Sequence, residues 1–251
     1  MSIHHPILLF AAGLIAGALN AAAGGGSFIT FPALIYAGVP PIIANASSTV
    51  ALFPGSVVST WAYRKDIRPF PGVAMSAMIV LTLIGGCCGA ILLLFTPSDG
   101  FNKMVPWLLL TGSLFFAFGK SAGNILRRKF HIGAGFMLSL QFLLGIYGGF
   151  FGGAVGIMMM SVYSIFGQSD IKMMNATKTL LVGVANSVAV MIFIVAGKVA
   201  WPPAGLMLIA TTLGGYLGAL FTRRLNPVYL RVGLIVFSFI LTVVFFFQVY
   251  G

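Results

Sequence analysis

The chain has 251 residues, of which 59% are hydrophobic and 7% are charged, and its net charge is +11. Soluble domains carry about 25% charged residues, so this composition excludes an ordinary water-soluble globular protein. The basic residues lie in short clusters between long apolar runs, which is typical of membrane topology rather than of a nucleic-acid-binding surface. We therefore expect an all-α polytopic membrane protein that contacts the lipid bilayer and no nucleic acid.

Two kinds of helix are expected along the chain. A bilayer core needs roughly 20 apolar residues in a helix, and about eight segments approach that length. Two apolar segments, 27–38 and 156–167, are too short to cross comfortably at about 1.5 Å per residue. In chain order we expect helices over 6–23, 27–38, 43–63, 70–95 and 102–122, then over 132–151, 156–167, 173–196, 202–221 and 227–249.

The two halves of the chain resemble each other at an offset of about 130 residues. Five similar segments recur in the same order, which predicts repeats over 1–122 and 132–251, joined by a cytoplasmic linker over 123–131 within one membrane domain. Each repeat would hold a glycine-broken helical hairpin followed by three transmembrane helices. The matched segments are Gly13–Gly17 with Gly145–Gly149, Gly24–Gly26 with Gly152–Gly156, Asn45–Thr49 with Asn175–Thr179, Gly85–Ala90 with Gly214–Ala219, and Pro97 with Pro227.

The distribution of basic residues predicts that the repeats are inverted. If each broken helix counts as a hairpin, each half crosses the membrane an odd number of times, and only Lys103 and Lys198 lie outside. If each broken helix counts as a single crossing instead, Arg223 and Arg224 fall on the side opposite Arg64, Lys65 and Arg68, and the basic residues no longer gather on one side. We therefore expect a multi-pass protein of the bacterial inner membrane with both termini outside. The cytoplasmic side would hold Arg64, Lys65, Arg68, Arg127, Arg128, Lys129, Lys172, Arg223, Arg224 and Arg231.

The glycine breaks are the first candidates for a binding site. Inverted repeats with interrupted helices place substrate where the breaks face each other. A helix start offers unpaired N–H groups and a partial positive charge, which suit an anion. The candidate residues here are Gly24, Gly25, Gly26, Ser27, Gly153 and Gly156. The alternative for these glycines is close helix packing, which we favour for Gly85, Gly86, Gly89, Gly214, Gly215 and Gly218.

Small polar residues after each short helix are the second candidates. Asn45, Ser47 and Ser48 in the first half correspond to Asn175, Thr177 and Lys178 in the second. Their side chains could line an anion site beside the breaks, or they could cap the helices that begin there. Asn20, one turn before the first break, and Asn186, on the helix of Lys178, complete the candidate set.

Lys178 is the most informative single residue. It replaces Ser48 of the first half and lies among apolar residues. An ionisable group inside the membrane is costly and therefore suggests function, although snorkelling to the interface is an alternative. The only acidic residues, Asp66, Asp99 and Asp170, fall in expected loops. Without a membrane carboxylate, a cation pump is disfavoured and an anionic substrate is favoured.

The motifs resemble the TauE/SafE permeases, also called the TSUP permeases, over essentially the whole chain. The resemblance rests on the break and short helix over Gly24–Pro32, on Asn45–Ser48, and on the repetition of both. The second half departs from the pattern, because Ile157 and Met158 align with Gly25 and Gly26, and Ser164 aligns with Pro32. The resemblance implies transport, often export, of sulfite, sulfoacetate or other organosulfonates, with no cofactor.

We therefore expect an organosulfonate or sulfite exporter that works by alternating access and binds a small anion. An anion channel is the alternative, since it would share most of these features. An enzyme is not expected, because no His, Asp or Glu constellation lies within the membrane segments. No metal site is expected either. The sequence leaves open the substrate, the direction of transport, the coupling ion and whether the protein forms a homodimer.

Overall fold

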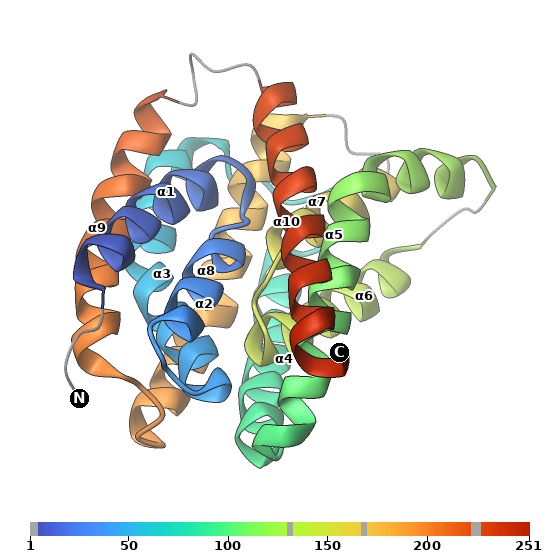
Figure 1. Cartoon of the computed structure of the whole chain (residues 1–251). Helices are drawn as coiled ribbons and strands as arrows, with labels where there is room; N and C mark the ends of the chain where they lie inside the picture. The colour runs from blue at the N-terminus through green and yellow to red at the C-terminus, as the bar shows by residue number, and fades with distance from the viewer. Residues whose placement is uncertain (1–4, 130–132, 167–169, 222–226) are drawn as a thin grey trace.

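Prolines, glycines and one aspartate set the ends of the helices. A computed structural model describes residues 5–129, 133–166, 170–221 and 227–251 of the chain, and within them the chain is almost entirely helical (Figure 1). The first half contains α1 (Pro6–Ala23), α2 (Ser27–Tyr36), α3 (Pro41–Tyr63), the short 3₁₀ helix η1 (Arg64–Asp66), α4 (Met75–Phe95) and α5 (Ser98–Lys129). The second half contains α6 (Ala134–Phe150), α7 (Val155–Ile165), α8 (Ile171–Val195), α9 (Trp201–Phe221) and α10 (Pro227–Tyr250).

Four helical segments are long and apolar enough to cross a membrane among the residues that the structure describes. They are Pro41–Asp66, Met75–Phe95, Ser98–Gly119 and Ile171–Val195. The segment that contains α3 is the most enclosed of the four, with 67% of its most apolar window buried inside the protein. Shorter apolar helices, α2 and α7 among them, complete the bundle. Helices of this length and composition fit a chain that passes the bilayer several times.

Several helix ends differ from the predicted ones. Helix α4 begins at Met75, because Pro71 and Gly72 form a turn in which Gly72 has a φ of +75°. Helix α5 continues to Lys129, so most of the expected linker is helical. Helices α3 and α8 begin at Pro41 and Ile171, two residues earlier than expected. Arg223, Arg224 and His131 lie outside the described residues.

Two helix pairs pack closely at opposite parts of the bundle, α1 with α9 and α4 with α6 (Figure 1). A Cβ atom on Gly214 would overlap the carbonyl oxygen of Leu14, and one on Gly89 would overlap that of Ile146. Small residues of this kind let helix backbones approach each other, which is the main packing device within lipid. The packing interpretation is therefore confirmed for the predicted glycines other than Gly215, whose Cβ would make only an ordinary contact at 3.7 Å, and it extends to Gly17 and Gly149.

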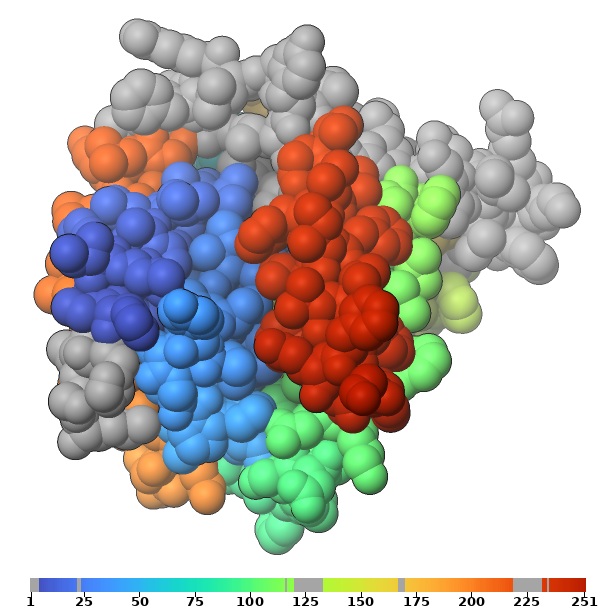
Figure 2. Space-filling model, in the orientation of Figure 1, coloured from blue at the N-terminus to red at the C-terminus, as the bar shows by residue number. Residues whose placement is uncertain are grey.

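Helices α3 and α8 lie between these two pairs. Helix α3 packs against α8 and α9, and α8 packs against α3 and α4. Helices α5 and α10 lie side by side, joined by a buried hydrogen bond of 3.2 Å between the Ser113 and Thr242 hydroxyls. The space-filling view shows α10 covering the front of the bundle beside α2 (Figure 2). The short helices α2 and α7 thus pack against longer helices, with one side of α2 in view at the front face.

Replacing Gly89 with Ala should destabilise the protein, because the new methyl group would meet the backbone of α6. Overpacking of this kind costs about 1–3 kcal/mol, which outweighs a gain of at most ~1 kcal/mol in helix propensity. Thermal unfolding of the purified protein in detergent measures the effect. Gly135→Ala on α6 is the matched control, because a Cβ there would meet nothing within 4 Å. Equal melting temperatures for both variants would contradict the packing role of Gly89.

Candidate functional site

Lys178 lies in the interior of the bundle, on α8, with its side chain only 2% exposed. Its Nζ atom has no hydrogen-bond partner among the described residues. The three carboxylates of the chain are at helix ends, because Asp66 lies in η1, Asp99 in the first turn of α5 and Asp170 caps α8. Lys178 therefore does not snorkel to an interface. It is a buried positive charge without a counter-ion in the described part of the protein.

Two glycines lie against Lys178, one from each helix break. A Cβ atom on Gly156 would lie 3.1 Å from Cδ of Lys178, and one on Gly24 would lie 3.6 Å from Nζ. The same Cβ on Gly24 would be 3.3 Å from Cα of Gly156, so the two backbones are in contact. We call Gly24, Gly156 and Lys178 the lysine centre. It brings together residues that are far apart in the sequence.

The first break is a left-handed turn at Gly24. The residue has a φ of +82°, which costs an L-amino acid energy, and its N–H donates to the carbonyl oxygens of Leu19 and Asn20. Helix α1 therefore ends at Ala23, and α2 begins at Ser27, three residues after Gly24. The backbone N–H groups of Gly25, Gly26 and Ser27 have no acceptor among the described residues.

The second break occupies the corresponding place after α6. Gly152 has a φ of +73° and Ala154 a φ of +59°, and α7 then begins at Val155. Gly153, Ala154, Val155 and Gly156 likewise have N–H groups without acceptors in the described residues. The breaks are close together, because a Cβ on Gly152 would lie 3.9 Å from both the Ser27 and Thr49 hydroxyl oxygens. Sequence reasoning missed Ala154, since nothing in its residue type indicates a site, and it included Thr49 only as the end of the segment Asn45–Thr49.

The polar residues of α3 hold the breaks in place. Asn45 Nδ2 donates to the carbonyl oxygen of Phe150, 2.9 Å away at the end of α6. Ser47 Oγ accepts from the N–H of Ala200 at 2.9 Å, just before α9. Ser48 shares a hydrogen bond with the Thr30 hydroxyl of α2. These candidate site residues therefore use their side chains within the fold.

The expectation that these residues cap helices is wrong. Pro41, the first residue of α3, has its φ preset for a helix start, so Asn45 and Ser47 lie inside that helix. Asp170 caps α8 by accepting from the N–H groups of Lys172 and Met173 at 3.0 and 3.2 Å. Asn175 and Thr177 are therefore also inside a helix.

Two polar atoms next to Lys178 in sequence are also unpaired. Asn175 Oδ1 and Thr177 Oγ1 are buried and have no hydrogen-bond partner in the described part of the chain. Asn175 is three residues before Lys178, which puts the two side chains on one face of α8. Buried polar atoms are usually hydrogen-bonded, so this cluster at the start of α8 is unusual.

The remaining candidates lie near the breaks or further along α8. A Cβ on Gly26 would be 2.8 Å from the Ala16 carbonyl oxygen, and one on Gly153 would be 2.6 Å from the Phe151 ring, so both glycines permit close packing. Asn20 contributes its carbonyl oxygen to the turn at Gly24. Asn186 is buried about two turns beyond Lys178 at 3.6 residues per turn.

The arrangement is suited to an anion. The start of α7 and the break that leads into α2 lie beside the Lys178 ammonium and have free N–H groups. A helix start also carries a partial positive charge. Membrane-length helices around such a centre define a multi-pass membrane protein with an interior that attracts negative charge. We detect no group of His, Cys, Asp and Glu that could hold a metal among the described residues.

The chain belongs to the family described as sulfite exporter TauE/SafE, whose model matches residues 9–245. It is 26% identical over 245 residues to the "Probable membrane transporter protein YfcA" of Escherichia coli (strain K12), covering 97% of this chain and 90% of the relative. It is 28% identical over 243 residues to a "Probable membrane transporter protein" of Haemophilus influenzae, covering 94% and 92%. No solved structure matches the chain. The protein is therefore a membrane transporter of this family, as its motifs predicted, and not a member of an enzyme family.

Lys178→Met should raise the thermal stability of the purified, anion-free protein. An unpaired buried charge costs a few kcal/mol, on the order of 1–4, and methionine of similar length removes that cost. Each kcal/mol shifts the melting temperature of a chain this size by about 2–4 °C. Lys172→Met is the matched control, because Lys172 is exposed on the same helix. A lower melting temperature for Lys178→Met would mean that the lysine stabilises the fold through contacts.

Proposed function

We propose that this transporter exports small sulfur-containing anions, such as sulfite, sulfoacetate or other organosulfonates, by alternating access at the bacterial inner membrane. The description of its family supports the substrate class and the direction. The observation that carries the proposal is the buried Lys178 ammonium without a counter-ion, placed between the two breaks.

A bound anion would satisfy several groups at once. It would neutralise the Lys178 charge, and the oxygens around a sulfur atom could accept from the ammonium and from N–H groups of both breaks. Charge-assisted hydrogen bonds are roughly twice as strong as neutral ones, and they are worth more in a low-dielectric interior. The unpaired Thr177 hydroxyl is a further donor on the same helix. The substrate would thus supply the partners that the protein lacks.

The helix packing supports the proposed inverted repeats. If α1 to α5 correspond to α6 to α10, the α1–α9 pair corresponds to α6–α4, and α3–α9 corresponds to α8–α4. Both members of each correspondence are in contact, and α3 packs against its own counterpart α8, as α5 does against α10. A two-fold relation requires this pattern of contacts. It favours halves over 1–122 and 132–251 and a substrate site at their interface.

A carrier fits the enclosure of Lys178 better than a channel does. A channel needs a continuous polar path, whereas the lysine side chain is 2% exposed and reaches neither surface. A carrier passes through an occluded state in which its site is closed on both sides.

Anion binding should depend on Lys178. Thermal shifts of the purified protein with sulfite, sulfate, thiosulfate and short sulfonates identify the ligand, since an anion at a hundred times its Kd stabilises by about 2.7 kcal/mol. Lys178→Met should lose this shift, and it should lose transport in proteoliposomes by at least about tenfold, the effect of ~1.4 kcal/mol. Lys172→Met should retain both.

The same proteoliposomes distinguish carrier from channel. A carrier should show saturable exchange, in which unlabelled anion on one side accelerates movement of labelled anion from the other. Stabilisation by none of these anions, or full transport by Lys178→Met, would refute the proposed site and substrate class.

The proposed topology places the C-terminus outside. Alkaline phosphatase fused after Gly251 should be active and a fluorescent protein fused there should be dark, because each folds on one side only. The matched control is a fusion of the same reporters after Arg68, which is expected in the cytoplasm with Arg64 and Lys65. A fluorescent fusion at Gly251 would contradict the proposed topology, because the second half would then cross the membrane an even number of times from the cytoplasmic linker.

A further inference from the structure

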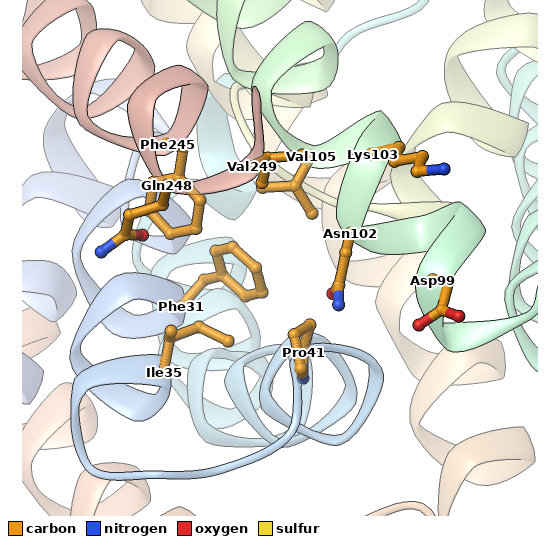
Figure 3. Close-up of a pocket in the computed structure, with 10 residues that line it drawn as sticks. All are labelled: Phe31, Ile35, Pro41, Asp99, Asn102, Lys103, Val105, Phe245, Gln248 and Val249. Atoms are coloured by element: carbon orange, nitrogen blue, oxygen red, sulfur yellow. The ribbon is translucent and has the colours of Figure 1, made fainter. Parts of the chain in front are cut away.

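A cavity of about 430 Å³ opens beside the far end of α2 (Figure 3). Its walls are the end of α2, the first residue of α3, the start of α5 and the end of α10. Its uncharged polar side chains are Asn102 of α5 and Gln248 of α10, and Phe31 lies between them. Asp99 and Lys103 add opposite charges, so the cavity holds no net charge that would trap an anion.

Helix α2 runs from the lysine centre to this cavity. It begins at Ser27, next to the breaks, and Ile35 near its end lines the cavity. Ser27, Phe31 and Ile35 are four residues apart and so lie on one face of the helix. At 1.5 Å per residue, the distance from Ser27 to Ile35 along the axis is about 12 Å. The cavity therefore lies a short distance along α2 from the break at Gly24.

Phe31 closes this short path. Its side chain is 1% exposed, and it stacks on Phe245 of α10 with ring centroids 5.8 Å apart. Its ring also meets that of Phe151 edge to face at 5.7 Å, and Phe151 immediately precedes the turn at Gly152. The contacts of the phenyl group are apolar, so a change of rotamer together with a small movement of α10 would open a way from the cavity toward the first break.

The corresponding position of the second half is closed more firmly. In the proposed repeat, Phe31 corresponds to Tyr163, at the same offset as Gly13 to Gly145. Tyr163 is fully buried, its ring lies 4.8 Å from that of Phe70, and its hydroxyl donates to Gln141 Oε1 at 3.2 Å. Gln141 in turn donates to Thr82 at 2.8 Å. A hydrogen-bonded layer thus covers the α7 side, while a single ring covers the α2 side.

The contact of α5 with α7 is also tighter than the contact of α10 with the end of α2. Helix α5 packs against α7, where a Cβ on Gly119 would overlap the Ser161 hydroxyl. The corresponding helix α10 is separated from the end of α2 by the cavity, which Val249 and Ile35 line from the two sides. The two halves are therefore in different states, and the side with the cavity is the one closer to opening.

We infer that the cavity is the outer mouth of the anion path, that Phe31 is its gate, and that Tyr163 is the gate on the cytoplasmic side. This inference rests on the proposed function. Outward release requires Phe31 to leave Phe245 and Phe151 while Tyr163 stays beneath Phe70. The inward-facing state reverses these contacts, with α10 closing on α2 and α5 leaving α7.

Cysteine labelling tests the gate without substrate or transport. In a background with Cys87→Ala and Cys88→Ala, Ser27→Cys reports access to the centre, and Ile35→Cys reports access to the mouth. The probe is sulfonatoethyl methanethiosulfonate, an anionic reagent that does not cross membranes, added outside. Ile35→Cys should react in every background. Phe31→Ala should speed the reaction at Ser27→Cys by about tenfold or more, because it raises the population of the open state.

Phe101→Ala is the matched control. Phe101 is equally buried and packs on Phe150 at 5.8 Å, but it does not line the cavity. It should leave the Ser27→Cys rate unchanged. An equal increase with Phe101→Ala, no increase with Phe31→Ala, or an unreactive Ile35→Cys would overturn the inference.

Inside-out vesicles test the side of the gate. When the reagent reaches the cytoplasmic face, Phe31→Ala should not increase the labelling rate of Ser27→Cys. Phe70→Ala combined with Tyr163→Phe should increase that rate. An increase with Phe31→Ala there would overturn the assignment of the mouth. The labelling rates do not depend on anion transport, so they test the gate separately from the anion site. The gate can therefore be refuted while the Lys178 site is upheld, and the Lys178 site can be refuted while the gate is upheld.

Discussion

One buried ammonium group without a carboxylate partner constrains the rest of this structure. Removing a charge from water is costly, and the chain holds only three acidic residues, all at helix ends. The fold instead places the break that leads into α2 and the start of α7 against Lys178, so that backbone of both halves meets at its side chain. Those helix starts are also positive, so the protein concentrates one sign of charge. A negative ligand is what stabilises such a centre.

Such a centre requires a rigid frame, which close helix packing supplies. The α1–α9 and α4–α6 pairs approach until a single methyl group would overlap a carbonyl oxygen. Asn45, Ser47 and Ser48 then connect α3 to α6, to the start of α9 and to α2. By contrast, ring contacts dominate where α2 meets α10. Polar contacts and tight packing fix the frame, and apolar rings cover the places that transport requires to move.

Much of this was readable in the sequence, because apolar length and glycine position determine helix ends in a membrane. Helix α1 ends at Ala23, as the following glycines predict, and Lys178 is conspicuous as a charge in an apolar run. The capping interpretation failed because Pro41 and Asp170 start the helices earlier. The partners of Asn45 and Ser47 are more than a hundred residues away, so only the folded chain reveals them. Phe31 escaped notice because an apolar helix normally contains phenylalanine.

The difference between the halves bears on how many anions one protein holds. In the proposed repeat, Ser48 corresponds to Lys178, and Ser48 is satisfied by Thr30 while the lysine is not. Two lysines at a two-fold interface would lie close together, repel each other and favour a doubly charged ligand. A single lysine touches the break of its own half at Gly156 and that of the other half at Gly24. One charge shared by both breaks favours one anion at the interface, where movement of either half alters its surroundings.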